Sequence, residues 1–172
     1  MSRRSFDPRT LAVTAVMTAI VFATTMIQLT LTPDGGYIHL GEAGILFSAF
    51  AFGPWVGAAV GGLGTALADL TLGFPQWAIF SLVIHGAQGW VAGWVSERWP
   101  GLGGLILATI LGGLIVVLGY LPVGILLEGQ LALASLPFNI LQVVIGGVIS
   151  VSLYYLVRRA YPPIVQQGRR RQ

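Results

Sequence analysis

Long apolar stretches separated by short breaks are the main pattern of this chain. The breaks carry glycine, proline or a charged residue, as turns at a membrane surface do. A helix that crosses roughly 30 Å of hydrocarbon needs about 20 apolar residues. Five stretches approach or meet that length and the second is a short span, so the pattern predicts six transmembrane helices. They cover residues 11–31, 43–52, 54–72, 75–95, 102–127 and 136–157.

The composition supports a membrane environment for all of these helices. Hydrophobic residues make up 55% of the 172 positions and charged residues 9%, with a mean hydropathy of +0.83. So few polar groups cannot cover a water-soluble globule of this size. We therefore expect an all-α membrane protein, with residues 1–172 forming a single integral membrane domain.

The charged residues predict how the chain is oriented. Six helices would leave every arginine on one side of the membrane and three acidic residues, Asp34, Glu42 and Glu128, on the other. By the positive-inside rule, the arginine side is the cytoplasm. Both termini are then cytoplasmic, in the plasma membrane of a prokaryote, with basic tails at 1–10 and 159–172. The second tail either lies against anionic headgroups or contacts a cytoplasmic partner. The arginines are Arg3, Arg4, Arg9, Arg98, Arg158, Arg159, Arg169, Arg170 and Arg171.

Two residue types are absent, and their absence excludes several functions. The chain has no cysteine, which excludes disulfides and cysteine metal sites. It has no lysine, which excludes an ATP-binding loop of the Gly-x-x-x-x-Gly-Lys type. Uphill transport would therefore draw its energy from another subunit or from an ion gradient.

Small residues recur every four positions on two of the predicted helices. Gly53, Gly57 and Gly61 would let a neighbouring helix approach to backbone contact. Three alanines, at positions 15, 19 and 23, form a similar row on the first helix. This row either packs inside the bundle or forms a docking strip for another membrane protein; its members are Ala15, Ala19 and Ala23.

Polar and aromatic residues gather toward the outer half of the predicted helices. Polar groups are costly in lipid, so they normally face the bundle interior or a cavity. We expect them to line a substrate pocket open to the outside. Some have simpler interpretations, such as a packed histidine at His85, and the spacing of His39 and Glu42 lacks a third metal ligand. The predicted pocket residues are His39, Glu42, Asp69, Gln76, Trp77, His85, Gln88, Tyr120, Asn139 and Gln142.

Several short motifs carry a resemblance to a known family. They are Gly-Tyr-Ile-His-Leu-Gly-Glu-Ala-Gly at 36–44, Phe-Gly-Pro at 52–54, Ala-Leu-Ala-Asp at 66–69 and Leu-Gly-Phe-Pro at 72–75. The chain resembles the substrate-binding S component of energy-coupling factor (ECF) vitamin transporters, in the riboflavin- or hydroxymethylpyrimidine-type branch. The resemblance extends over all six helices.

The resemblance implies a mechanism and a set of partners. An S component captures a vitamin or its precursor from outside and then associates with a transmembrane coupling subunit and two cytoplasmic ATPases. Ala15 and Ala19 would match the alanine motif that docks on the coupling subunit. The resemblance implies no enzymatic activity, no cofactor and no nucleic-acid partner.

One departure from the family pattern bears on the substrate. The chain reads His85-Gly-Ala-Gln-Gly89 where the family commonly has Lys-Gly-x-Glu-Gly, which removes two charges from the middle of the membrane. An imidazole and a carboxamide can bracket an uncharged ring by hydrogen bonds, whereas a phosphate would need cations. We therefore expect a neutral heteroaromatic compound, such as hydroxymethylpyrimidine, a pyridoxine-like compound or riboflavin.

The sequence is less typical of two other classes of function. A stand-alone proton-coupled transporter would use Asp69, Glu42 and Glu128 as a relay, but no inverted repeat is apparent. An intramembrane enzyme is disfavoured because its usual motifs are missing, and Ser81 with His85 is only an i, i+4 coincidence.

Overall fold

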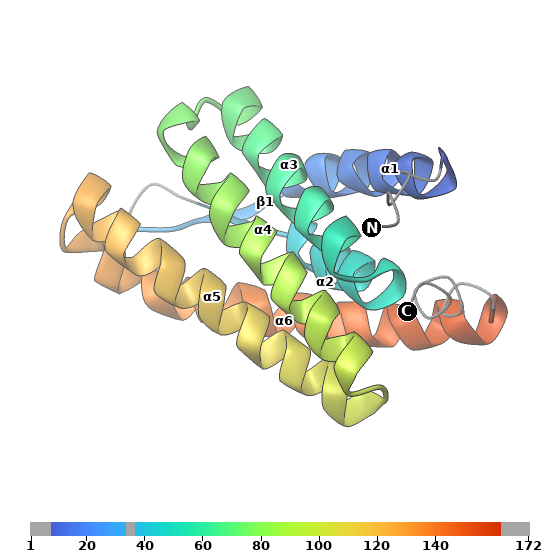
Figure 1. Ribbon diagram of the computed structural model, residues 1–172. Helices are drawn as coiled ribbons and strands as arrows, with labels where there is room; N and C mark the ends of the chain where they lie inside the picture. The colour runs from blue at the N-terminus through green and yellow to red at the C-terminus, as the bar shows by residue number, and fades with distance from the viewer. Residues whose placement is uncertain (1–7, 34–36, 163–172) are drawn as a thin grey trace, which may run out of the picture.

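A bundle of helices and one short hairpin make up the described part of the chain. The computed structural model describes residues 8–33 and 37–162. Six helices lie within these ranges, which confirms the expected all-α membrane bundle (Figure 1). They are α1 (Pro8–Thr25), α2 (Gly41–Phe52), α3 (Pro54–Leu72), α4 (Pro75–Arg98), α5 (Leu102–Glu128) and α6 (Leu131–Ala160). Parts of both predicted basic tails, residues 1–7 and 163–172, lie outside the described residues.

Glycines with positive φ separate the last five helices. They lie at the predicted breaks, where φ is 88° at Gly53 and Gly73, 110° at Gly101 and 68° at Gly129. Glycine adopts this left-handed backbone without the steric cost that a Cβ atom brings. The breaks read from the sequence are therefore real helix ends.

The first apolar stretch is not a single helix, so the prediction of a helix over 11–31 was wrong at its end. Helix α1 stops at Thr25, and strand β1 (Gln28–Leu31) follows it. This strand pairs antiparallel with β2 (Tyr37–His39), with Gln28 opposite His39. Residues 28–31 alternate polar and apolar, and apolar length alone does not distinguish a strand from the end of a helix.

Helix α2 is short and occupies the centre of the bundle. Ten of its twelve residues are buried, and it packs against α1, α3, α4 and α6. Its length is about 18 Å at 1.5 Å per residue, which is less than the hydrocarbon thickness. The other five helices are long and apolar enough to cross a membrane. The segment expected to be the second transmembrane helix is thus a short buried helix, into which β2 leads.

Helices α3 and α4 approach each other to backbone contact. A Cβ atom at Gly61 would lie 2.5 Å from the carbonyl oxygen of His85, and one at Gly57 would lie 2.6 Å from that of Gly89. The glycine row of the third helix therefore packs inside the bundle, which was the expected role of Gly57 and Gly61. This contact holds His85 at a fixed height against α3.

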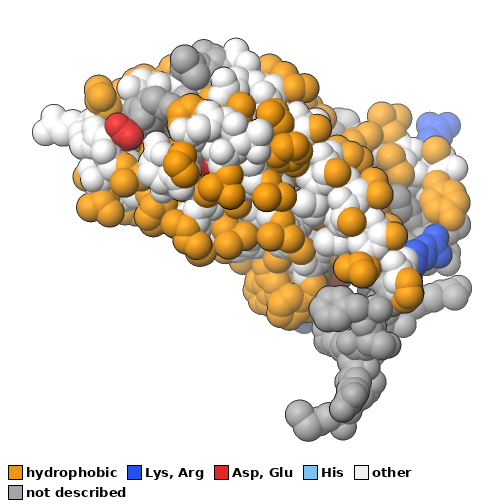
Figure 2. Space-filling view, turned by 90° about the horizontal axis from the view of Figure 1, so that it is seen from above, with side chains coloured by type: hydrophobic (Ala, Val, Ile, Leu, Met, Phe, Trp, Pro, Cys, Tyr) orange, Lys and Arg blue, Asp and Glu red, His pale blue; other side chains and the backbone are white. Residues whose placement is uncertain are grey.

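The ends of the helices fall into two groups. The start of α1, the α2–α3 and α4–α5 turns and the end of α6 lie toward the right in Figure 1, and the hairpin and the other two turns lie toward the left. Hydrophobic side chains cover much of the length between the two ends, while the blue basic side chains in Figure 2 lie at the right. This distribution is typical of a protein that spans a bilayer.

Candidate functional site

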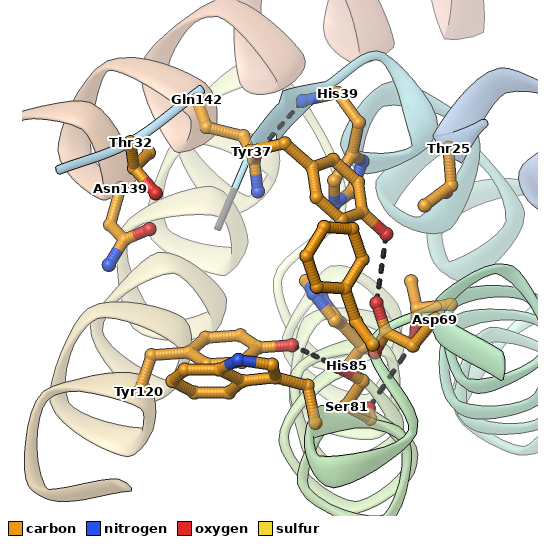
Figure 3. Close-up of a pocket in the computed structure, with 13 residues that line it drawn as sticks. Thr25, Thr32, Tyr37, His39, Asp69, Ser81, His85, Tyr120, Asn139 and Gln142 are labelled. Carbon is orange, nitrogen blue, oxygen red and sulfur yellow. Dashed lines mark hydrogen bonds between the residues drawn. The ribbon is translucent and has the colours of Figure 1, made fainter. Parts of the chain in front are cut away.

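A pocket of about 60 Å³ lies beneath the hairpin, where it meets α3, α4, α5 and α6. Seven of the ten pocket residues expected from the sequence line it (Figure 3). The long helices supply six of them, and strand β2 supplies the seventh. They are His39, Asp69, Trp77, His85, Tyr120, Asn139 and Gln142.

The other three expected residues lie elsewhere. Glu42 and Gln88 are fully buried behind His85 and do not line the pocket. Gln76 is exposed, although its neighbour Trp77 is only 8% exposed and forms part of the wall. Consecutive helical residues point about 100° apart, so Gln76 and Trp77 face different sides of α4.

Six lining residues were not predicted. The signal for Tyr37 was its spacing of two from His39, because alternate residues of a strand share a face. The signal for Ser81 was its spacing of four from both Trp77 and His85 on α4. The threonines come from segments that only the tertiary fold brings together. The residues missed are Thr25, Thr32, Tyr37, Thr65, Phe74 and Ser81.

Two hydrogen bonds tie the hairpin to the bundle. The Tyr37 hydroxyl donates to Asp69 Oδ1 of α3 at 2.8 Å, and the backbone N–H of His39 donates to Gln142 Oε1 of α6 at 3.0 Å. Both bonds are dashed in Figure 3. The hairpin is therefore held over the pocket from two opposite helices.

Burial sets the protonation of the two hairpin side chains that face the pocket. It lowers the pKa of His39 to about 3, and the nearby His85 contributes in the same direction. It also raises the pKa of Tyr37, with the charge of Asp69 adding to the effect. His39 is thus a neutral imidazole at physiological pH, and Tyr37 keeps the proton that it donates to Asp69.

Three buried polar atoms at the pocket make no hydrogen bond within residues 8–33 and 37–162. They are Asp69 Oδ2, His39 Nδ1 and Thr25 Oγ1. A buried polar atom without a partner costs free energy unless water or a ligand satisfies it. Asp69 Oδ2 is an acceptor, so it suits a ligand that carries an N–H or O–H group.

Aromatic rings form two walls of the pocket. The rings of Trp77 and Tyr120 lie 5.8 Å apart at 49°, and those of Tyr37 and Phe74 lie 5.5 Å apart at 36°. Figure 3 shows Tyr120 on the side opposite Asp69. Such walls suit a flat ring that stacks on an aromatic face. None of the lining residues is an arginine.

The alanine row of α1 lies on the surface of the bundle. Ala15, Ala19 and Ala23 are all exposed, and α1 contacts α3 and α2 through its other side. Of the two interpretations left open by the sequence, the geometry matches an outward-facing strip.

Comparison with known proteins identifies the family. Residues 5–159 match the family described as "ECF-type riboflavin transporter, S component". The chain belongs to this family. It is accordingly the substrate-capture subunit of an ECF-type vitamin transporter, a multi-pass membrane protein that works with an ECF module and is not an enzyme.

Two relatives align with most of this chain. The chain is 38% identical over 149 residues to an "Uncharacterized protein in gap 3'region" of Pyrococcus woesei, across 86% of this chain and all of the relative. It is 39% identical over 126 residues to "Thiamine precursor transporter HmpT" of Lactococcus lactis subsp. cremoris, across 73% of this chain and 72% of the relative.

Proposed function

We propose that this S component captures a neutral or weakly basic compound with one heteroaromatic ring, of the hydroxymethylpyrimidine type. The observation that carries the proposal is the pocket itself, which is small, walled by aromatic rings and supplied with an unpartnered acceptor at Asp69. The relative named as a thiamine precursor transporter supports the same class of substrate.

The size of the pocket favours one ring over three. A volume of about 60 Å³ holds roughly four to six water-sized probes, at 10–15 Å³ each. That space suits a single ring with short substituents. Riboflavin, with three fused rings and a sugar-alcohol chain, is much larger.

Each of these lining residues would contact a particular group of such a ring. Asp69 Oδ2 would accept a hydrogen bond from an amino or hydroxymethyl group. Gln142 uses its oxygen for the hairpin, so its amide nitrogen is left to donate to a ring nitrogen. Trp77 and Tyr120 would cover one face of the ring.

Binding measured by calorimetry on the purified full chain tests this proposal. We expect an aminopyrimidine with a hydroxymethyl group to bind at least about tenfold more tightly than riboflavin. Replacing Trp77 with alanine should weaken binding by about tenfold, since the stacking wall is lost, whereas Trp55→Ala should leave binding unchanged because Trp55 is 67% exposed. Tighter binding of riboflavin would refute the proposed substrate class.

We further propose that both termini are cytoplasmic and that the pocket opens to the outside, within a single membrane domain of residues 1–172. The described arginines support this orientation, because Arg9, Arg98 and the pair at 158–159 lie in the first or last turns of helices whose ends group together in Figure 1.

The absence of cysteine makes this orientation simple to test. Gln130 and Pro100 are exposed residues at opposite ends of the bundle. In intact cells, a membrane-impermeant maleimide should label the Gln130→Cys variant and should label Pro100→Cys only after permeabilisation. The reverse pattern would invert the proposed topology.

Finally, we propose that the exposed strip formed by Ala15, Ala19 and Ala23 docks on the coupling subunit. A row of small residues lets another helix approach closely, and α1 is the long helix with the smallest buried share. The side chains that pack α1 to its neighbours point elsewhere, so the strip is free for a partner.

A further inference from the structure

Three fully buried polar side chains form a chain of hydrogen bonds behind the pocket. Gln88 Nε2 donates to Glu42 Oε1, and Gln88 Oε1 lies 2.8 Å from His85 Nδ1. Glu42 and Gln88 are 0% exposed, and His85 is 1% exposed. Of the three, only His85 lines the pocket. Glu42 and Gln88 can therefore act on a ligand only through His85.

The chemistry of these groups gives the chain of bonds a direction. The amide nitrogen of Gln88 faces Glu42, whose Oε1 accepts its hydrogen bond. The amide oxygen of Gln88 then faces His85, and an oxygen of this kind also only accepts. The proton between Gln88 and His85 must therefore lie on Nδ1 of His85.

The proton on Nδ1 of His85 determines the state of the other ring nitrogen, Nε2. A neutral imidazole carries a single N–H, so Nε2 is left with a lone pair and no proton. The neutral form is favoured because His85 is only 1% exposed and a buried charge is costly. Nδ1 contacts the uncharged amide of Gln88, and Glu42 Oε2 lies 3.7 Å from it, beyond hydrogen-bond distance. The pocket thus presents an acceptor at His85.

Glycines of the surrounding helices hold this arrangement in place. Gly146 of α6 packs directly against the side chain of Glu42, and a Cβ atom at Gly112 of α5 would lie 3.2 Å from Cγ of Gln88. Gly61 of α3 packs against the backbone of His85. Because α3, α5 and α6 pack closely against the chain of bonds, its side chains have little room to turn.

We propose that Glu42 and Gln88 are positioning residues that fix the Nδ1–H tautomer of His85 and thereby make the pocket select ligands with a hydrogen-bond donor at His85 Nε2. The ligand class rests on the proposed function above. With Asp69 Oδ2 as the second acceptor, the preferred ligand offers two donors, as a ring with one amino and one hydroxyl group does.

The tautomer can be measured without any ligand. The chain has two histidines, so nitrogen NMR of ring-labelled histidine gives few signals, and a His39→Gln variant identifies those of His85. We expect the proton of His85 on Nδ1 at neutral pH. A proton on Nε2, or on both nitrogens, would overturn the proposal whatever the substrate is.

Two variants test the effect on selectivity. The probes are a hydroxymethyl aminopyrimidine and the matching pyrimidinone, in which a carbonyl replaces the amino group. The wild type should prefer the amino probe by about tenfold or more. Glu42→Gln keeps the shape but can donate as well as accept, and Gln88→Met removes the link, so both should mix the tautomers and lower this preference by about tenfold.

A matched variant and the NMR result distinguish failure of the positioning role from failure of the proposed substrate class. Gln130→Met, at an exposed position outside the pocket, should retain the preference of the wild type. Folded Glu42→Gln and Gln88→Met proteins with unchanged preference and unchanged His85 signals would refute the positioning role. If the wild type binds neither probe, the proposed substrate class fails, while the NMR experiment still decides the tautomer.

Discussion

Replacing Asp69 with asparagine should weaken binding of an amino-substituted pyrimidine by about tenfold to a hundredfold. The substitution preserves size but turns one acceptor into a donor, at the buried oxygen that has no partner in the described chain. A hydrogen bond to a charged group contributes about 1.5–3 kcal/mol, and each 1.4 kcal/mol is a factor of ten in affinity. Calorimetry on the purified protein measures the change.

A second variant distinguishes ligand contact from an effect on the hairpin. Tyr37→Phe removes the bond between the hairpin and Asp69 but leaves the carboxylate intact. It should therefore weaken binding less than Asp69→Asn. Thr71→Ala, an exposed change on the same helix, should have no effect. Equal affinity of Asp69→Asn and the wild type would show that this carboxylate does not contact the ligand.

Replacing Ala19 with tryptophan should reduce vitamin uptake by about tenfold or more while ligand binding to the purified S component is unchanged. Ala19 lies in the middle of the exposed alanine strip, and it is not a lining residue of the pocket. An indole on this flat surface would keep the partner helix away from close contact. Uptake in cells with the complete transporter, together with co-purification of the coupling subunit, measures the effect.

The same substitution on another helix provides the control. Ala87 is also an exposed alanine in the membrane-spanning part of the chain, but it belongs to α4. Ala87→Trp should retain uptake and association. Loss of uptake in both variants would point to a general effect of bulk at the lipid-facing surface, and full uptake in Ala19→Trp would exclude the strip as the docking site.

Apolar length and turn chemistry were enough to predict most of the fold. The helices from 54 to 128 begin and end within a few residues of their predicted limits, because glycine and proline mark a change of backbone direction in the local sequence. The six helices and the membrane class followed from the same pattern. The hairpin did not, because its strands have only four and three residues, and so short an alternation is not distinguished from the end of a long apolar stretch.

The candidate site was also predicted only in part from the sequence. The sequence by itself indicated which polar residues are too costly to leave in lipid, and Asp69, His85 and Gln142 were found on that basis. Only the tertiary structure decided that Gln76 turns outward, that Tyr37 joins Asp69, and that the pocket is lined by segments as distant as Thr25 and Asn139.

The hydrogen bonds from Glu42 through Gln88 to His85 show why the sequence indicates the buried polar residues but not their partners. Hydrophobicity is a property of each residue and can be read along the chain, whereas the direction of a hydrogen bond depends on which partner the packing of α2 against α4 brings within reach. The sequence therefore determined the solvent, the helices and the polar residues that must be buried. The packed bundle decided which of these groups satisfy one another and which are left for a ligand.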